Sequence, residues 1–146
     1  MQHEFITFEI AGQTFGLDIM AIREIRAWSP ATRLPNVPHY IAGVVNLRGT
    51  VLPVVDLAAR LGWAATEPTP RHAIIVTQVN GQTRGLIVDA VSDIVSIGQE
   101  ALQPPPSPTG DAIDRFVEFL VAIEDRMVMV LDLASITDDP LQQVAA

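Results

Sequence analysis

The sequence predicts an all-β protein with a few short helices, built as two similar lobes. The first observation behind this prediction is an internal duplication, in which residue 11 falls on residue 80 and the segment 11–25 aligns on 80–94 without a gap, an offset of 69. The second is that the hydrophobic runs are short and lie between glycine and proline turns. The third is that no stretch reads as a long helix. Together they favour small closed barrels over an α/β sheet.

The duplication continues further along the chain. The segment 54–58 reappears as 130–134, an offset of 76. The seven extra residues of the second copy (76 − 69) fall around the proline-rich stretch 104–108, so we interpret 103–110 as an inserted loop.

The first strands are expected at the N-terminus. Alternation over 5–10 and a run over 13–17, separated by Ala11-Gly12, predict a hairpin. Asp18 is then expected to cap a short helical turn over 19–25. The two prolines of the segment 34–38 exclude a helix or a central strand, and we interpret it as an ordered connector.

The same elements recur in the second half. Runs over 73–79 and 82–88 flank Asn80-Gly81, a strong hairpin signal. Asp56 and Asp132 are expected to cap brief helices after the buried strands. These strands cover 51–55 and 127–131, Gly62 would end the first helix, and 64–70 would be the loop joining the copies.

Composition limits the function classes. With 49% hydrophobic and 18% charged residues over 146 positions, the chain is expected to fold, either as one compact domain or as two interlocked lobes, and is too short for two large independent domains. It contains no cysteine, which excludes disulfides and thiolate sites, and its apolar runs are shorter than the roughly 18 residues of a membrane helix. The N-terminus has no basic region typical of a secretory signal. We therefore expect a cytoplasmic protein without direct membrane insertion.

The net charge of −8 argues against a nucleic-acid partner. The charge is also segregated: residues 19–66 hold five arginines and two acids (+3), while the remainder holds four arginines and fifteen acids (−11). This locally basic segment suits the docking of an acidic partner. The alternative is an ordinary surface of solvated arginines.

Catalytic patterns are not found. The histidines His3, His39 and His72 form no metal-binding spacing, and no phosphate-binding or nucleophile motif is present. The adjacent acid pairs 124–125 and 138–139 are interpreted as solvated charge. We therefore expect that the protein is not an enzyme and that it binds neither a metal nor a cofactor. The alternative is a small-ligand-binding or enzymatic β-barrel protein that uses a groove between the lobes.

The segment that differs most between the copies is 40–57. In it, two apolar strands flank the turn Asn46-Leu47-Arg48-Gly49, which projects one arginine. An arginine held on a rigid hairpin can grip a carboxylate or a carbonyl of a partner. Two structural alternatives remain open: Asn46 and Gly49 as simple turn formers, and Arg48 in an internal ion pair with Glu24 or Asp56.

These motifs, taken together, closely resemble the CheW-like family of chemotaxis coupling proteins. The resemblance covers about residues 4–137, as a single domain of two lobes, and leaves 138–146 as a C-terminal tail. It is carried by seven segments: Phe15-Gly16-Leu17-Asp18-Ile19, Arg23-Glu24-Ile25-Arg26, Thr32-Arg33-Leu34-Pro35-Asn36-Val37-Pro38, Ile41-Ala42-Gly43, Asn46-Leu47-Arg48-Gly49, Pro53-Val54-Val55-Asp56-Leu57 and Gly85-Leu86-Ile87-Val88-Asp89-Ala90-Val91.

The resemblance implies a fold and a function. The fold would be two interlocked five-stranded SH3-like barrels. The function would be a non-enzymatic adaptor that links the cytoplasmic tips of chemoreceptors (methyl-accepting chemotaxis proteins) to the regulatory domain of the histidine kinase CheA. Such an adaptor needs no cofactor and would be recruited from the cytoplasm to receptor arrays at the membrane.

The resemblance also implies partner-binding positions. They fall on Ile22, Glu24, Gly43 and Arg48, with the turn residues Asn46, Leu47 and Gly49 beside them. Arg48→Glu and Gly43→Asp are accordingly expected to weaken binding and to leave the fold largely intact. One departure stands out: Phe119 occupies a position where the family usually has glycine, so a local turn or contact is expected to differ.

Overall fold

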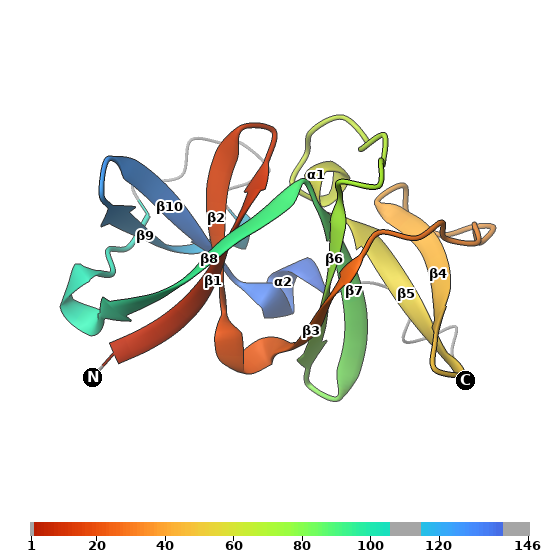
Figure 1. The fold of residues 1–146 in the computed structure, drawn as a ribbon, viewed down its shortest axis with the longest axis horizontal. Coiled ribbons are helices and arrows are strands. Elements are labelled where there is room, and N and C mark those ends of the chain that lie inside the picture. The colour runs from red at the N-terminus through yellow and green to blue at the C-terminus, as the bar shows by residue number, and fades with distance from the viewer. Residues whose placement is uncertain (1, 106–114, 139–146) are drawn as a thin grey trace.

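The computed structural model describes residues 2–105 and 115–138. Within them the chain forms two five-stranded sheets, each closed into a small barrel (Figure 1). This confirms the predicted fold class. The strands are β1 (Gln2–Ile10), β2 (Gln13–Asp18), β3 (Ile22–Ala27), β4 (Ile41–Leu47), β5 (Thr50–Asp56), β6 (Ala73–Val79), β7 (Gln82–Val88), β8 (Ala90–Gly98), β9 (Val117–Ile123) and β10 (Arg126–Leu131). Short helical segments are η1 (Ile19–Ala21), α1 (Leu57–Arg60), η2 (Gln99–Ala101) and α2 (Leu133–Ile136).

The two lobes do not coincide with the two copies of the sequence. The first lobe has the strand order β8-β1-β2-β10-β9, and the second has β3-β6-β7-β5-β4. Offsets of 69 and 76 map β3 onto β8, β1 onto β6, β2 onto β7, β4 onto β9 and β5 onto β10, so the two orders are equivalent. Each copy has therefore given its first hairpin to the sheet of the other copy, and this exchange interlocks the lobes.

Both predicted hairpins that the copies exchange are confirmed. Ala11 and Gly12 turn between β1 and β2 with φ of 52° and 79°, and Asn80 and Gly81 turn between β6 and β7 with φ of 53° and 78°. Two successive residues with positive φ give the turn whose twist matches that of the flanking strands. The bounds of β6 and β7 are those predicted from the sequence.

The predicted aspartate caps are also present. The Asp56 carboxylate accepts a hydrogen bond from Ala59 N (3.4 Å), and Asp132 accepts one from Ala134 N (3.2 Å). Asp56 has a second role, because it also accepts hydrogen bonds from the backbone N and the hydroxyl of Thr66, both at 2.7 Å. It thus anchors the loop that follows α1, and Gly62, at φ 98°, ends that helix as expected.

The helical turn predicted over 19–25 is wrong for most of its length. Only Ile19–Ala21 is helical, with the Asp18 carboxylate accepting from Met20 N at 2.9 Å. From Ile22 the chain is strand β3, paired antiparallel with β6. The Ile22–Arg26 sequence suits a helix, but pairing with a strand of the other copy outweighs this local preference.

The connectors behave as predicted where they are described. The segments 34–38 and 64–70 form neither helix nor strand. Of the loop 103–110 only 103–105 are described, and of the tail 138–146 only Asp138; the rest of both lies outside the described residues. No helix in the described part of the chain is long and apolar enough to cross a membrane.

The largest hydrophobic cluster lies between the lobes. It joins Phe8 and Phe15 of the first lobe to Val55 and Leu57 of the second. A smaller hydrophobic cluster fills the interior of each barrel: one surrounds Leu52 in the second lobe, and the other surrounds Val128 in the first. Because the main core is shared, the lobes form one packed body.

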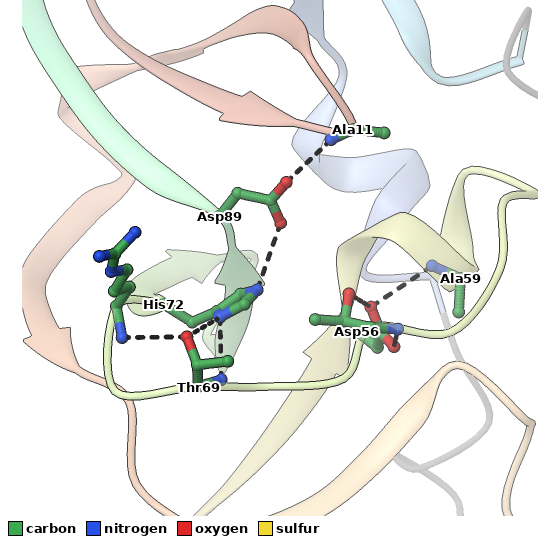
Figure 2. Close-up of polar contacts among 8 residues, drawn as sticks. Ala11, Asp56, Ala59, Thr69, His72 and Asp89 are labelled. Atoms are coloured by element: carbon green, nitrogen blue, oxygen red, sulfur yellow. Dashed lines mark hydrogen bonds and ion pairs between the residues drawn. The ribbon is translucent and has the colours of Figure 1, made fainter.

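Polar contacts reinforce this shared core. The Asp89 carboxylate accepts from Ala11 N of the first lobe (2.9 Å) and lies 3.4 Å from His72 Nε2 of the second (Figure 2). Thr69 N donates to His72 Nδ1 at 3.0 Å, which assigns the ring proton to Nε2, facing Asp89. Asp89 therefore joins the β1–β2 turn to the loop that precedes β6.

Candidate partner-binding surface

The seven residues that the family resemblance singles out, Ile22, Glu24, Gly43, Asn46, Leu47, Arg48 and Gly49, all lie in the second lobe, and we call them the candidate surface. Ile22 and Glu24 are on β3, and the others are on β4 or in the β4–β5 turn. These two strands are the first and last of the sheet order, so the barrel must close for them to meet.

Arg48 and Glu24 meet at this closure. Arg48 Nη2 lies 2.7 Å from Glu24 Oε1, and Nη1 lies 3.5 Å from Oε2. Of the two open alternatives for an internal ion pair, the structure thus selects Glu24 over Asp56. The Arg48 side chain remains 70% exposed and that of Glu24 29%, so the pair is accessible to a partner.

Charge around this pair is concentrated on the exposed face. Arg26 Nη1 approaches the same carboxylate at 3.8 Å, which leaves two cations on one anion. The hydrogen bond from Arg48 is the largest effect and lowers the pKa of Glu24; burial opposes it, and the charges of Arg48 and Arg26 lower the pKa further. Glu24 reciprocally raises the pKa of Arg48. The group therefore stays ionised at neutral pH with an excess of positive charge.

The turn that carries Arg48 is rigidly built. Arg48 and Gly49 have φ of 49° and 86°, and the side-chain oxygen of Asn46 accepts from Gly49 N at 2.8 Å. Asn46 and Gly49 therefore form the turn, which is one of the two structural alternatives that the sequence left open for this segment. Their contribution is to fix the backbone from which Arg48 projects.

Gly43 occupies a place where no side chain fits. It is a buried bulge residue of β4 with φ 145°, and a Cβ built on it would clash with the carbonyl oxygen of Thr32. Thr32 exchanges two backbone hydrogen bonds with Val44, at 2.8 and 2.9 Å. The expectation that Gly43→Asp leaves the fold largely intact therefore needs correction, because the added side chain must displace this bridge.

Two members of the candidate surface point inward. Leu47 is only 9% exposed and belongs to the core of the second barrel. Ile22 is partly buried against the shared core. The locally basic segment is likewise less exposed than its charge suggests, because the Arg60 guanidinium lies 4.2 Å from the Tyr40 ring and 4.9 Å from the Phe116 ring.

The structure adds an exposed apolar pair that the sequence reasoning missed. Ile25 on β3 is 44% exposed, and Ile94 on β8 is 59% exposed. The offset of 69 relates them (25 + 69 = 94), so the same exposed position is apolar in both copies. The signal was present in the repeat alignment, where Ile25 falls on Ile94, but exposure on an edge strand cannot be read from one sequence.

Phe119 is the counterpart of Gly43 in the first lobe (43 + 76 = 119). It pairs with Val130 next to a bulge of β9 and β10, and it is absent from the residues with positive φ. The neighbouring bridge is retained, with Gln103 N and Leu120 N each donating to the other's carbonyl at 2.9 and 2.7 Å. The expected difference is therefore a change of side-chain contact, with the Phe119 ring packed beside the first barrel core.

Comparison with known proteins gives a consistent picture. The model of the CheW-like domain family matches residues 4–140. The chain is 50% identical over 133 residues to the chemotaxis protein CheW of Rhizobium meliloti, covering 91% of this chain and 86% of that protein. It is 46% identical over 142 residues to a probable chemotaxis protein CheW of Rhizobium etli (97% and 92%). The crystal structure of the scaffolding protein TtCheW from Thermoanaerobacter tengcongensis superposes with a TM-score of 0.87 at 33% identity, covering 94% of each chain.

Proposed function

The chain belongs to the CheW-like domain family, and on that basis we propose that it is a non-enzymatic adaptor of a chemosensory array. It couples the cytoplasmic tips of chemoreceptors to the regulatory domain of a CheA-type histidine kinase. It acts in the cytoplasm and is recruited to receptor arrays at the membrane.

The observation that carries this proposal is the exposed ion pair at the closure of the second barrel. Arg48 projects from a rigid turn and is 70% exposed although it pairs with Glu24. A guanidinium held in place keeps free donors for a carboxylate or carbonyl of a partner, at little additional cost in side-chain entropy. We propose that the candidate surface is a partner-binding site, with Arg48 and Glu24 in contact with the partner and Gly43, Asn46, Leu47 and Gly49 acting through the backbone.

We propose that Ile25 and Ile94 are additional contact positions, separate from the ion pair. Each lies on an edge strand, β3 in one lobe and β8 in the other, and each is substantially exposed. Exposed apolar side chains are suited to the centre of a protein interface, which is depleted of charged residues and surrounded by a polar rim. A partner that touches both would engage both lobes at once.

The mechanism we propose is scaffolding without turnover. The shared core makes the two lobes one rigid body, so partners bound to it are held at a fixed separation. This raises their effective concentration for each other. A preference for one conformation of the kinase, worth about 1–3 kcal/mol, is sufficient to transmit a signal.

Reconstitution tests this proposal. Purified chain, a chemoreceptor cytoplasmic fragment and CheA are combined, and receptor-dependent autophosphorylation of CheA is measured with and without the chain. We expect stimulation by the wild type and its loss with Arg48→Glu, with only a small change in melting temperature. A chain that binds neither receptor fragment nor CheA would contradict the proposal.

A further inference from the structure

A recess lies on the first lobe, away from the candidate surface. It encloses about 360 Å³ between β1, β9, β10 and the segment that follows β8. Its lining residues are His3, Phe5, Asp18, Gln99, Leu102, Glu118, Phe119, Val130 and Leu131. We call it the β9 recess.

The floor of the β9 recess is apolar. Phe5, Val130 and Leu131 are at most 4% exposed and form its base, and the partly buried Leu102 and Phe119 form its walls. Phe119 matters here because a glycine at this position would remove one wall. An apolar recess of this size accommodates one or two side chains of a partner.

The rim of the recess is acidic. Asp18 and Glu118 line it, and Asp132 lies close enough to act on Glu118. Burial raises the pKa of Glu118, and the charges of Asp132 and Asp18 raise it further. In the described part of the chain, no arginine or histidine forms an ion pair with these three carboxylates.

Among the residues that line the recess, His3 is the one basic side chain, and no ion pair joins it to the rim carboxylates. The segments 106–114 and 139–146, which the structure does not describe, contain no lysine or arginine, and together they hold three aspartates. The carboxylates of the rim are therefore available to a cationic group of another molecule.

The corresponding recess of the second lobe has the opposite character. It is lined by Arg33 and His39, and Ala42 stands where the first lobe has Glu118 (42 + 76 = 118). Its one carboxylate, Asp56, is already satisfied by Thr66 and Ala59. Because the duplicated sites differ in charge, the acidic rim is specific to the first lobe.

We propose that the β9 recess is a docking site for an arginine, flanked by an apolar residue, on a protein segment other than a second copy of this chain. The guanidinium pairs with Glu118 and Asp18 at the rim, and the apolar neighbour packs on Phe119 and Leu102. Arginine suits the site better than lysine, because its planar fork can bridge two carboxylates. This site goes beyond the proposed function and does not depend on it.

The test uses a defined probe, the peptide acetyl-Leu-Arg-Leu-amide, titrated into the isotope-labelled full chain and followed by amide chemical shifts. We expect saturable shifts at Leu102, Glu118 and Phe119. The same peptide with citrulline, which has the shape of arginine without its charge, should bind at least about tenfold more weakly, a factor typical of a lost charged hydrogen bond.

Two matched variants locate the interaction. Glu118→Gln should weaken binding by about tenfold and fold at least as well as the wild type, because it removes a charge that burial disfavours. Glu124→Gln removes one negative charge from the exposed β9–β10 turn and should leave the affinity unchanged. Phe119→Gly should also weaken binding, through loss of the apolar wall.

Several outcomes would overturn the proposal. The first is the absence of saturable shifts at the recess, and the second is shifts confined to Arg33 and His39 of the second lobe. The third is an equal loss of affinity in Glu118→Gln and Glu124→Gln, which would show that the peptide responds only to the net charge of the protein. Self-association in sedimentation experiments that both Glu118→Gln and Arg33→Gln abolish would identify the occupant as a second copy and would equally reject a separate partner.

Discussion

Arg48 and Glu24 lie on opposite edges of one sheet and form the shortest ion pair among the described residues, at 2.7 Å. The pair therefore does two things in one place. It joins the side chains of β3 and the β4–β5 turn, beside the backbone bridge between Thr32 and Val44, and it presents a charged group to the solvent. Separating these two roles is the most direct way to test the candidate surface.

Charge exchange separates them. Arg48→Glu alone should abolish partner binding with only a small change in melting temperature, because exposed ion pairs contribute little to stability. The double variant Glu24→Arg/Arg48→Glu restores an ion pair at the closure but reverses its orientation. We expect it to recover the melting temperature and not the binding, measured by pull-down with receptor fragment and CheA. Recovery of binding by the double variant would show that Arg48 acts only through the closure.

Gly43 should be sensitive to any side chain. Gly43→Ala is expected to lower the free energy of unfolding by about 3 kcal/mol, because the Cβ clashes with Thr32 and the positive φ is strained. Gly49→Ala is the matched control, since its φ is also positive but nothing lies within 4 Å of its Cβ. It should cost only about 1 kcal/mol. Urea denaturation of both variants measures the difference, and equal losses would refute the clash.

Much of this fold could be predicted from the sequence because its signals are local. The positive-φ turns at 11–12 and 80–81 and the aspartate caps depend on neighbouring residues, and all of them are confirmed. The exchange of hairpins between the copies could not be predicted in the same way. The repeat alignment shows which strands of the two copies are equivalent, but it carries no signal for whether a strand pairs within its own copy or with the other copy.

The candidate surface shows the same limit. The sequence placed Arg48 at the tip of a hairpin and named Glu24 as one possible partner, but barrel closure decides between Glu24 and Asp56. The inward position of Arg60 was not foreseen, since its acceptors Ser135 and Ile136 lie 75 and 76 residues away. Long-range contacts of this kind are set by the packing of the lobes.

Glu118 should make the stability depend on pH. Its pKa is raised in the folded chain, so the native state holds this proton at a higher pH than the unfolded state. Stability is therefore lost as the pH rises from the usual glutamate range through the raised value. Glu118→Gln should raise the melting temperature at neutral pH by about 1 °C, because repulsion at a mostly exposed site is screened. This gain in melting temperature should vanish at acidic pH, where Glu118 is protonated. A gain of the same size at every pH would mean that the substitution acts through packing and not through charge.

Arg60 should act as a clamp between the lobes. From α1 of the second lobe it donates to the carbonyls of Ile136 (3.0 Å), Ser135 (3.1 Å) and Asp138 (3.1 Å). Arg60→Lys keeps the charge but cannot form all three bonds or both ring contacts, and should cost about 2 kcal/mol in urea denaturation. Arg71→Lys, on the exposed loop before β6, is the control and should be neutral. Equal stability of both variants would show that the contacts of Arg60 do not hold the two lobes together.

The hairpin exchange makes a prediction about fragments of the chain. A break between Pro68 and Thr69, in the exposed loop before β6, yields one fragment with β1–β5 and one with β6–β10. Neither fragment contains a complete sheet, because β1 and β2 need β8 and β10, and β3 and β5 need β6 and β7. Each fragment alone should therefore lack stable tertiary structure, and the two together should rebuild both barrels.

Fluorescence can follow this complementation cleanly. Both tryptophans, Trp28 and Trp63, are in fragment 1–68, so the other fragment contributes no tryptophan signal. In the intact chain Trp28 N donates to His72 O, and Trp63 packs against the core shared by both lobes. Adding fragment 69–146 should shift the emission of fragment 1–68 to the blue and restore cooperative unfolding. A fragment 1–68 that unfolds cooperatively on its own would mean that a copy can pair within itself, and that the interlocked arrangement does not hold in solution.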